Sequence, residues 1–326
     1  DRIGSSKKYK ITNLKIIGEI NGTDLSMIRE MAGRNSTGNS TDGKLSVLDL
    51  SEAKIVEGGD YYYKDYYTSN DVIGSYAFYG CSGLTSLTLP AGITSIGFYA
   101  FYGCSGLTSL TLPAGITEIG YRAFCRCSRL TSLTLPAGIT KIGFETFYGC
   151  SGLTSLTLPA GITEISYGAF YGCSGLTSLT LPAGITEIGD NAFCGCSGLT
   201  SLTLPAGITK IGLWAFEYCS GLKEVRICIN DNLDTYLTKG HPFIDVDCGF
   251  KYYINDKEIT SIEIPSNVTT LGNYVFQGRR GLTSLNLPAG ITEIGSGAFW
   301  DCSGLTSLTL PAGITEIGYG AFYGCI

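Results

Sequence analysis

Residues 84–106 read LTSLTLPAGITSIGFYAFYGCSG, and this 23-residue sequence recurs with small changes along most of the chain. One phenylalanine marks the register, and within two runs its copies are 23 residues apart: Phe78, Phe101, Phe124, Phe147, Phe170, Phe193 and Phe216, then Phe276, Phe299 and Phe322. A strict period of this length is typical of a solenoid, in which each repeat forms one coil. The repeat therefore decides the fold before any single residue is considered.

Each repeat begins with a predicted strand, as in Leu84–Pro90, where apolar and polar side chains alternate. The proline ends the strand because it has no N–H group to donate. Later in the repeat, Ala100, Phe101 and Cys104 have the spacing of one helical turn and share one inward face. The sequence therefore predicts one strand and one short helical turn in every coil.

A single coil of this size cannot bury its apolar side chains, so successive coils must stack and align Leu, Ile, Phe and Cys in columns. Equivalent strands then pair in parallel, about 4.8 Å apart. Crossovers between parallel strands are nearly always right-handed. The sequence therefore predicts a repeat solenoid that winds as a right-handed superhelix, with one parallel β-strand per coil.

Residues 1–44 lie outside the repeat and are predicted to form an N-terminal cap. Leu14–Ile20 has the pattern of a strand. Thr23 or Asp24 is predicted to cap a helix that ends near Ala32. Because terminal coils of a solenoid need atypical covers, this strand and helix are expected to close one end.

Residues 45–326 are predicted to form the solenoid, with insertions at about 57–71 and 228–256. The first insertion has five tyrosines within the seven residues Tyr61–Tyr67. Rings at this density either cover the flank of the first coils or form a binding loop. In the second insertion the strand Leu222–Ile227 is followed by irregular sequence, and the next matching strand is predicted to begin at Ile259.

The amino-acid composition restricts the classes of partner that the protein is expected to bind. The formal charge is −6, only 15% of residues are charged, and no basic stripe is present, which argues against nucleic acid or an anionic membrane. No apolar run approaches the length of a membrane-spanning helix, so membrane insertion by this segment is not predicted. The chain starts at Asp1 without an apolar leader, and a signal or anchor segment is expected to lie outside this sequence.

Thirteen cysteines would ordinarily indicate disulfides, but nine of them occupy one column of the repeat. Side chains at equivalent positions of stacked coils run parallel and stay too far apart to bridge, so we interpret the column as buried free thiols. The two Cys-x-Cys pairs lack further ligands at zinc spacing, so neither a metal nor another cofactor is predicted. A bridge between Cys228 and Cys248 stays open.

Catalytic groups are scarce. His241 is the only histidine, and its neighbours Gly240 and Pro242 suit a turn rather than a Ser-His-Asp or Cys-His arrangement. Glutamates recur at one position of the repeat, but the same position holds Lys141 and Lys210. We interpret this position as a row of solvated charges. No catalytic residue is assigned, and the protein is not predicted to be an enzyme.

Variation between repeats is greatest beside the phenylalanine. The positions three residues before it and one residue after it are mostly Phe or Tyr, yet they also accept Asp, Asn, Glu and Gln, so they are not core. Exposed aromatic rows often mark binding surfaces, although neighbouring rings also stack and stiffen a solenoid. The candidate ligand-binding residues on this flank are Tyr79, Phe98, Tyr102, Tyr121, Phe144, Tyr148, Tyr167, Tyr171, Trp214 and Trp300.

The strand followed by Pro, the I-T-x-I-G segment and the A-F-x-G-C-x-x-L turn resemble the BspA-like leucine-rich repeats, over residues 72–229 and 255–326. The resemblance implies a leucine-rich-repeat solenoid in a secreted or surface-anchored protein that mediates attachment or protein binding. It implies no catalytic residues. We therefore expect an extracellular adhesion module that recognises a protein or glycan of a host or neighbouring cell. The alternative is a structural stalk that displays other domains.

The last coil is the second place where association is expected. Its predicted strand, Leu305–Pro311, has a partner coil on one side only. An open strand edge beside apolar side chains is an association site unless something covers it. The sequence therefore predicts either that the native chain continues past Ile326 or that two copies meet end to end through this coil.

Overall fold

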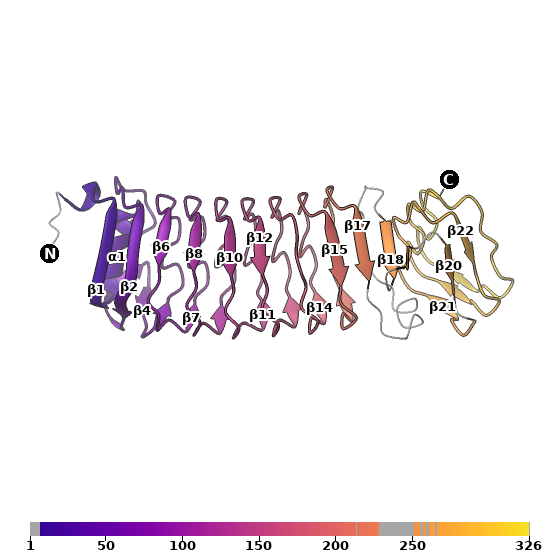
Figure 1. Cartoon of the computed structure of the whole chain (residues 1–326), viewed down its shortest axis with the longest axis horizontal. Coiled ribbons are helices and arrows are strands. Elements are labelled where there is room, and N and C mark those ends of the chain that lie inside the picture. The colour runs from indigo at the N-terminus through magenta and orange to yellow at the C-terminus, as the bar shows by residue number, and fades with distance from the viewer. Residues whose placement is uncertain are drawn as a thin grey trace. The chain divides into compact units, whose positions relative to one another are not determined.

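The computed structural model describes residues 7–325 apart from residues 213, 228–250, 255–256, 259–260 and 265. The chain divides into two compact units, an N-terminal unit of Asp1–Leu176 and a C-terminal unit of Thr177–Ile326. Both units consist of stacked coils with short parallel strands, which confirms the predicted solenoid (Figure 1). Among the described residues, helix is confined to the N-terminal cap.

In the N-terminal unit one sheet runs through the coils in the order β1-β2-β6-β8-β10-β12. Its strands are β1 (Asn13–Ile20), β2 (Val47–Ile55), β6 (Ser86–Thr88), β8 (Ser109–Thr111), β10 (Ser132–Thr134) and β12 (Ser155–Thr157). Shorter strands pair elsewhere in the coils, namely β5 (Val72–Ile73), β7 (Ser95–Ile96), β9 (Glu118–Ile119), β11 (Lys141–Ile142) and β13 (Glu164–Ile165). Equivalent residues face each other, as Leu87 faces Leu110.

The helical turn predicted in each coil does not form in the described coils. The chain instead makes a run of tight turns, in which alternate N–H groups bond to the next coil. The N–H groups of Tyr76 and Phe78 donate to the carbonyls of Phe98 and Ala100, at 2.9 and 2.7 Å. Positive φ angles, such as 61° at Tyr76 and 72° at Gly80, permit this alternation. A helix would direct every N–H along its own axis and would leave the coils unlinked here.

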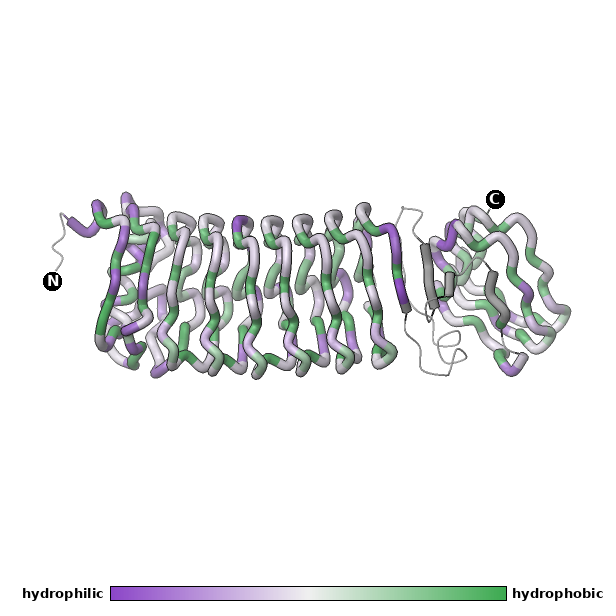
Figure 2. Tube along the Cα trace, in the orientation of Figure 1, coloured by the Kyte–Doolittle hydropathy of each residue, from purple (hydrophilic) through white to green (hydrophobic). Residues whose placement is uncertain are grey.

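The core of each coil is centred on the phenylalanine of the repeat. In the N-terminal unit all five of these phenylalanines are fully buried, and neighbouring rings lie nearly parallel with centroids 5.2–5.5 Å apart. Figure 2 shows apolar positions recurring at equivalent places in successive coils of this unit. The apolar side chains of each coil are therefore buried by contact with the neighbouring coils, as expected of a repeat that cannot bury its own apolar face.

The N-terminal cap contains the 3-10 turn η1 (Lys8–Lys10), strand β1 and helix α1 (Gly22–Met31). Asn21 caps the helix by accepting from the N–H groups of Thr23 and Asp24, and Asp24 accepts in return from the Asn21 N–H. The prediction of Thr23 or Asp24 as the cap was wrong, because Asn21 is the residue with the extended backbone that an N-cap adopts. The predicted strand is confirmed, and it pairs in parallel with β2.

Side chains of the cap and of the first insertion replace the backbone donors that a preceding coil would supply. In later coils of this unit three carbonyls of the tight turns accept N–H groups from the coil before. Their equivalents in the first coil belong to Ser75, Ala77 and Tyr79, and the first two have side-chain donors. The Tyr62 hydroxyl donates to Ser75 O at 2.6 Å, and Arg29 Nη1 donates to Ala77 O at 2.9 Å. Both donors are fully buried, so the end of the solenoid is closed by hydrogen bonds as well as by apolar contact.

The C-terminal unit continues the pattern. Its strands β14 (Glu187–Ile188) and β16 (Lys210–Ile211) pair with each other. One sheet has the order β15-β17-β18-β19, from β15 (Ser201–Leu204), β17 (Glu224–Ile227), β18 (Lys251–Ile254) and β19 (Lys257–Glu258). The others pair β20 (Ser261–Glu263) with β22 (Ser284–Asn286), and β21 (Thr270–Leu271) with β23 (Glu293–Ile294) and β24 (Glu316–Ile317).

The second insertion differs from the prediction in one respect. It was expected to be irregular up to the next matching strand, but it contains β18, which pairs in parallel with β17, with Glu224 opposite Lys251. The sequence Tyr-Tyr-Ile in β18 has high strand propensity without the leucines of the repeat, so the repeat pattern overlooked it. The repeat register resumes at β20, where Ile262 faces Leu285.

The last coil also differs from the prediction, because no strand forms over Leu305–Pro311. Strand β24 of this coil pairs with β23 on one side. Leu310 and Ile317 are 42% and 48% exposed, so the coil carries apolar surface. Association through this surface stays a prediction.

Truncating a stacked ring tests the nearest-neighbour character of the core. Phe147 lies between Phe124 and Phe170, and Phe147→Ala removes both ring contacts. We expect a cost of about 3–5 kcal/mol. Hydrogen exchange should show loosening concentrated in residues 124–170, because coils contact only their neighbours. Uniform loosening of every described coil would contradict this account of the core.

Removing one hydroxyl tests the closure of the first coil. Tyr62→Phe leaves the carbonyl of Ser75 without its side-chain donor, and we expect a loss of about 1–3 kcal/mol. Hydrogen exchange should report faster opening around residues 62–80. The control is Tyr67→Phe in the same insertion, where an exposed hydroxyl is removed and no change is expected. Equal hydrogen-exchange rates around residues 62–80 in the two variants would show that the hydrogen bond to Ser75 does not stabilise the first coil.

Candidate interaction surface

The first candidate column lies three residues before the buried phenylalanine and is exposed in four successive coils. Phe98, Tyr121, Phe144 and Tyr167 have exposed fractions of 47%, 55%, 36% and 44%. Phe98 stacks on Tyr121 with centroids 5.4 Å apart, and Phe144 stacks on Tyr167 at 5.1 Å. Between the two pairs, Tyr121 meets Phe144 edge-on at 6.3 Å. We call these four residues the aromatic row.

The second candidate column, one residue after the phenylalanine, is half-buried. Tyr79 stacks on Tyr102 at 5.0 Å, and Tyr148 stacks on Tyr171 at 4.8 Å, both nearly parallel. The buried Cys125 separates the two pairs. In the C-terminal unit Trp300 is half-buried and packs against Tyr323 at 4.3 Å. Trp214, the remaining candidate, is 47% exposed.

Ring stacking, which the sequence offered as the alternative to ligand binding, is therefore present in both columns. Stacking leaves much of the first column exposed to solvent. Ring stacking that stiffens the solenoid and ligand binding by the same residues therefore do not exclude each other. Because neighbouring rings cover each other's faces, the row presents mainly ring edges and tyrosine hydroxyls. Ligand binding by the ten candidates stays a prediction.

A third column lies two residues before each phenylalanine, and the sequence analysis named only Trp214 from it. It contains Tyr99, Arg122 and Glu145, all with positive φ. Arg122 Nε lies 2.6 Å from Glu145 Oε2, and Arg122 Nη1 donates to Tyr99 Oη at 2.9 Å. The Arg122 guanidinium also lies 5.3 Å from the ring centre of Phe144, which ties this column to the aromatic row. These bonds raise the pKa of Arg122, chiefly through the hydrogen bond to Glu145.

The tyrosine-rich insertion forms an antiparallel hairpin of β3 (Gly58–Tyr63) and β4 (Tyr66–Thr68). Tyr62 and Tyr63 are buried, and Tyr63 stacks on Tyr76 of the first coil at 5.2 Å. The hairpin therefore covers the flank of the first coils, as one of the two predictions had it. Tyr61 and Tyr67 remain 44% and 57% exposed, and a binding role for them stays a prediction.

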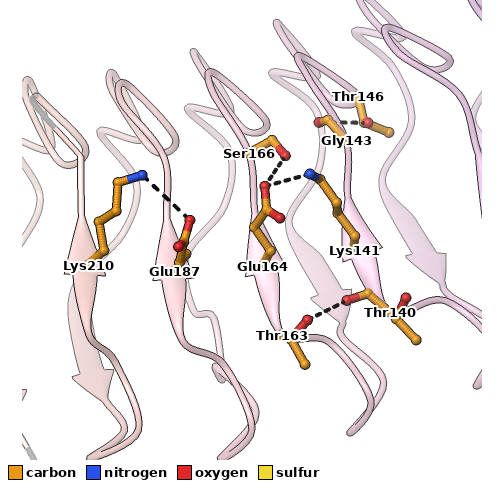
Figure 3. Close-up of polar contacts among 9 residues, drawn as sticks. All are labelled: Thr140, Lys141, Gly143, Thr146, Thr163, Glu164, Ser166, Glu187 and Lys210. Carbon is orange, nitrogen blue, oxygen red and sulfur yellow. Dashed lines mark hydrogen bonds and ion pairs between the residues drawn. The ribbon is translucent and has the colours of Figure 1, made fainter.

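The column of glutamates and lysines is solvated, as predicted. Figure 3 shows Lys141 pointing to Glu164, with Nζ and Oε1 2.7 Å apart, and Lys210 pointing to Glu187, with Nζ and Oε2 3.6 Å apart. Between 34% and 65% of each of these side chains is exposed. Exposed pairs of this kind contribute at most about 1 kcal/mol and give no buried carboxylate for acid–base chemistry.

The cysteine column consists of free thiols, as predicted, and all eleven cysteines among the described residues are unbridged. Seven thiols of the column donate to a backbone carbonyl, a contact that the sequence analysis missed. Cys104 Sγ donates to the carbonyl of Phe78 at 3.1 Å, and six later cysteines repeat the contact at 2.9–3.2 Å. Burial raises the pKa of Cys81 to about 11 and that of Cys302 to about 12.

Chemistry at other positions is limited. No group of three or more His, Cys, Asp or Glu side chains in the described part of the chain lies close enough to hold a metal ion. His241 and the pair Cys228 and Cys248 lie outside the described residues. No helix in the described ranges has the length and apolar character needed to cross a bilayer.

Stacked coils with in-register strands and a buried apolar column define a leucine-rich-repeat protein. A family model described as the BspA type leucine rich repeat region matches six copies, over residues 71–170, 117–240 and 249–326. These matches span most of the chain. The chain therefore belongs to the BspA-type leucine-rich repeat family.

Solved structures share this architecture. A leucine-rich repeat protein from Bacteroides ovatus is 26% identical, with a TM-score of 0.57, over 97% of this chain and 77% of that one. A leucine rich cell surface protein from Faecalibacterium prausnitzii is 24% identical, with a TM-score of 0.39, over 82% and 86% of the two chains. The pneumococcal vaccine antigen PcpA is 16% identical, with a TM-score of 0.37, over 95% and 72%. No curated protein matches the chain.

Thiol reactivity tests the cysteine column. A thiol whose pKa is about 11 is ionised in about one molecule in a thousand at pH 8, and the thiolate is the reactive form. Native protein treated with iodoacetamide at pH 8 should therefore keep Cys81 and Cys302 unmodified, whereas the half-buried Cys325 should react first. Peptide mapping by mass spectrometry reads the sites, with protein unfolded in guanidinium as the fully reactive control. Rapid labelling of Cys81 in the native protein would contradict its burial.

Proposed function

We propose that this protein is a non-catalytic binding or adhesion module, secreted or held at the cell surface, that recognises a partner through its aromatic row. The observation that carries the proposal is the exposure of an aromatic side chain at the same position of four successive coils, from Phe98 to Tyr167. An apolar row in solvent costs solvation free energy unless a partner covers it. The surface location is part of the proposal and follows the family resemblance.

The geometry of the row favours a protein over a glycan as the partner. Sugar rings bind aromatic side chains by lying on the ring face, and here stacking between neighbours occupies much of the faces. Ring edges and tyrosine hydroxyls instead suit the mixed apolar and polar contacts of protein interfaces, in which Tyr and Arg are enriched. Arg122 and its partners lie against the same row. These features support a protein ligand.

Two matched double variants test the proposal. Phe98→Ser/Tyr121→Ser removes a stacked pair of the row, with exposed fractions of 47% and 55%. Tyr61→Ser/Tyr67→Ser removes an edge-on pair of the hairpin, with nearly the same exposed fractions of 44% and 57%. We expect the first variant to weaken binding to secreted and surface host proteins on an array by about tenfold or more, as loss of hot-spot residues does. The second should bind like the wild type.

The opposite result would point to the structural stalk. If neither the wild type nor any variant binds a protein or glycan on the array, the stacked rings serve only to stiffen the coils. Binding that survives the Phe98 and Tyr121 changes would place recognition elsewhere on the molecule. Melting temperatures of both variants close to that of the wild type show that lost binding is not lost folding.

A further inference from the structure

One coil of the N-terminal unit carries an unusual set of charges. In residues 107–129, Arg126 and Arg129 stand at two positions where every other coil of this unit has glycine. The same coil carries a third arginine, Arg122, at a position that holds Tyr, Glu or Gly in the other coils of the unit. Because these coils are otherwise so similar, three arginines in one coil call for a physical reason.

Each of the three positions disfavours a side chain. Arg122 and Arg126 have φ angles of 53° and 61°, in the left-handed region that only glycine adopts without cost. At the position of Arg129, a Cβ added to either neighbouring equivalent, Gly106 or Gly152, would collide with a backbone carbonyl oxygen of the coil before. Backbone strain that persists in spite of a cheaper residue points to function.

The three arginines differ in what holds them. Arg122 is fixed between Glu145 and Tyr99, and 34% of its side chain is exposed. Arg126 and Arg129 are exposed, and within the described residues neither forms an ion pair. The Arg126 guanidinium lies 5.9 Å from the ring centre of Tyr102. The residues beside Arg126 and Arg129 at equivalent positions are glycines, namely Gly103, Gly149, Gly106 and Gly152.

The local charge is opposite to that of the chain. Residues 84–152 contain four basic and two acidic residues, whereas the whole chain has a formal charge of −6. Glu145, the acidic residue nearest to these arginines in the turn segments, is already bonded to Arg122 at 2.6 Å. The charges of Arg126 and Arg129 are therefore left for another molecule.

We propose that Arg126 and Arg129, in the coil that also carries Tyr121 of the aromatic row, bind the carboxylates of an acidic segment of a partner protein. The inference rests on the proposed function and names the chemistry of its partner. A guanidinium presents parallel N–H donors that match both oxygens of one carboxylate. The two glycines on either side of each arginine leave room for an approaching chain. Arg122 and the exposed rings of Tyr121 and Phe144 then contact the apolar residues of the same segment.

The test uses fluorescence anisotropy with a fluorescein-labelled oligoglutamate peptide as the probe. Arg126→Gly/Arg129→Gly restores the residue of the repeat at both positions and relieves the backbone, so the fold is kept. Lys223→Thr/Arg280→Ser is the matched control, because it removes two positive charges and also restores repeat residues. We expect the first variant to bind about tenfold more weakly for each arginine removed, and the control to bind like the wild type.

Specificity has its own controls. Oligoglutamine of the same length should not bind, and the affinity for oligoglutamate should fall when ionic strength rises to about 0.15 M. The inference is overturned if the wild type does not bind oligoglutamate, or if the arginine variant binds it as well as the wild type does. It is also overturned if heparin binds more tightly through the same arginines, which would assign them to a sulfated glycan. Self-association abolished by the arginine variant would assign them to a second copy, with the same consequence.

A comparison of the two double variants separates this inference from the proposed function. Host-protein binding that is lost in Phe98→Ser/Tyr121→Ser but kept in Arg126→Gly/Arg129→Gly rejects the acidic partner and leaves the proposed function intact. Host-protein binding kept in both variants rejects the aromatic row and the acidic partner together. Loss in both variants, with the Lys223 and Arg280 control intact, supports the two together.

Discussion

The structure depends on the register in which each coil lies on the next. Ring stacking between equivalent phenylalanines, strand pairs such as Leu87 with Leu110, and the bonds between tight turns all require residues 23 positions apart to face each other. A slip of one residue would turn the strand leucines outward and would break the other two contacts at once. The similarity in sequence between coils is therefore a consequence of packing. The core side chains and hydrogen-bonding groups of each coil must lie opposite those of its neighbour.

The tight turns bear the conformational cost of this register. Alternate N–H groups reach the next coil only if residues such as Tyr76 and Gly80 adopt positive φ angles. For a residue other than glycine this conformation costs about 1–2 kcal/mol. The cost is offset by hydrogen bonds between neighbouring coils, and the first coil keeps two of them because Tyr62 and Arg29 supply donors from outside the repeat.

The sequence was sufficient for the periodic part of the structure and insufficient where distant residues meet. The spacing of the phenylalanines predicted the solenoid, and the cysteine column predicted free thiols, because both follow from one coil facing the next. The spacing of Ala100, Phe101 and Cys104 fits a helical turn and tight turns equally well, so the hydrogen bonds between coils could not be read from it.

Contacts outside the repeat were beyond such reasoning. Nothing in the sequence pairs Arg29 with Ala77 or Tyr62 with Ser75, since folding of the hairpin onto the first coil creates these contacts. In the candidate site, the exposure of the aromatic row was predicted because equivalent positions in other coils hold polar residues. The column of Tyr99, Arg122 and Glu145 was missed because its residue types vary, and the bonds that join them appear only in the structure.

Threonine hydroxyls next to the strands explain why these positions vary little between coils. The Thr108 hydroxyl donates to the carbonyl of Thr85 at 3.1 Å, and Thr131 does the same to Thr108 at 3.2 Å. Near the start of the shorter strands, Thr163 bonds to the carbonyl of Thr140 at 3.4 Å (Figure 3). These hydroxyls link one coil to the next, so replacing one removes a bond between coils.

The side chains of the turn columns are under a different constraint. Their backbone groups already make the bonds between coils, as the N–H of Arg122 does to the carbonyl of Phe144 at 3.0 Å. A side chain at such a position can change without breaking a link, provided that the backbone tolerates its φ angle. Tyr, Arg, Glu and Trp therefore occupy such positions only where the gain exceeds that cost, and the coil of Arg122 and Arg126 accepts it twice.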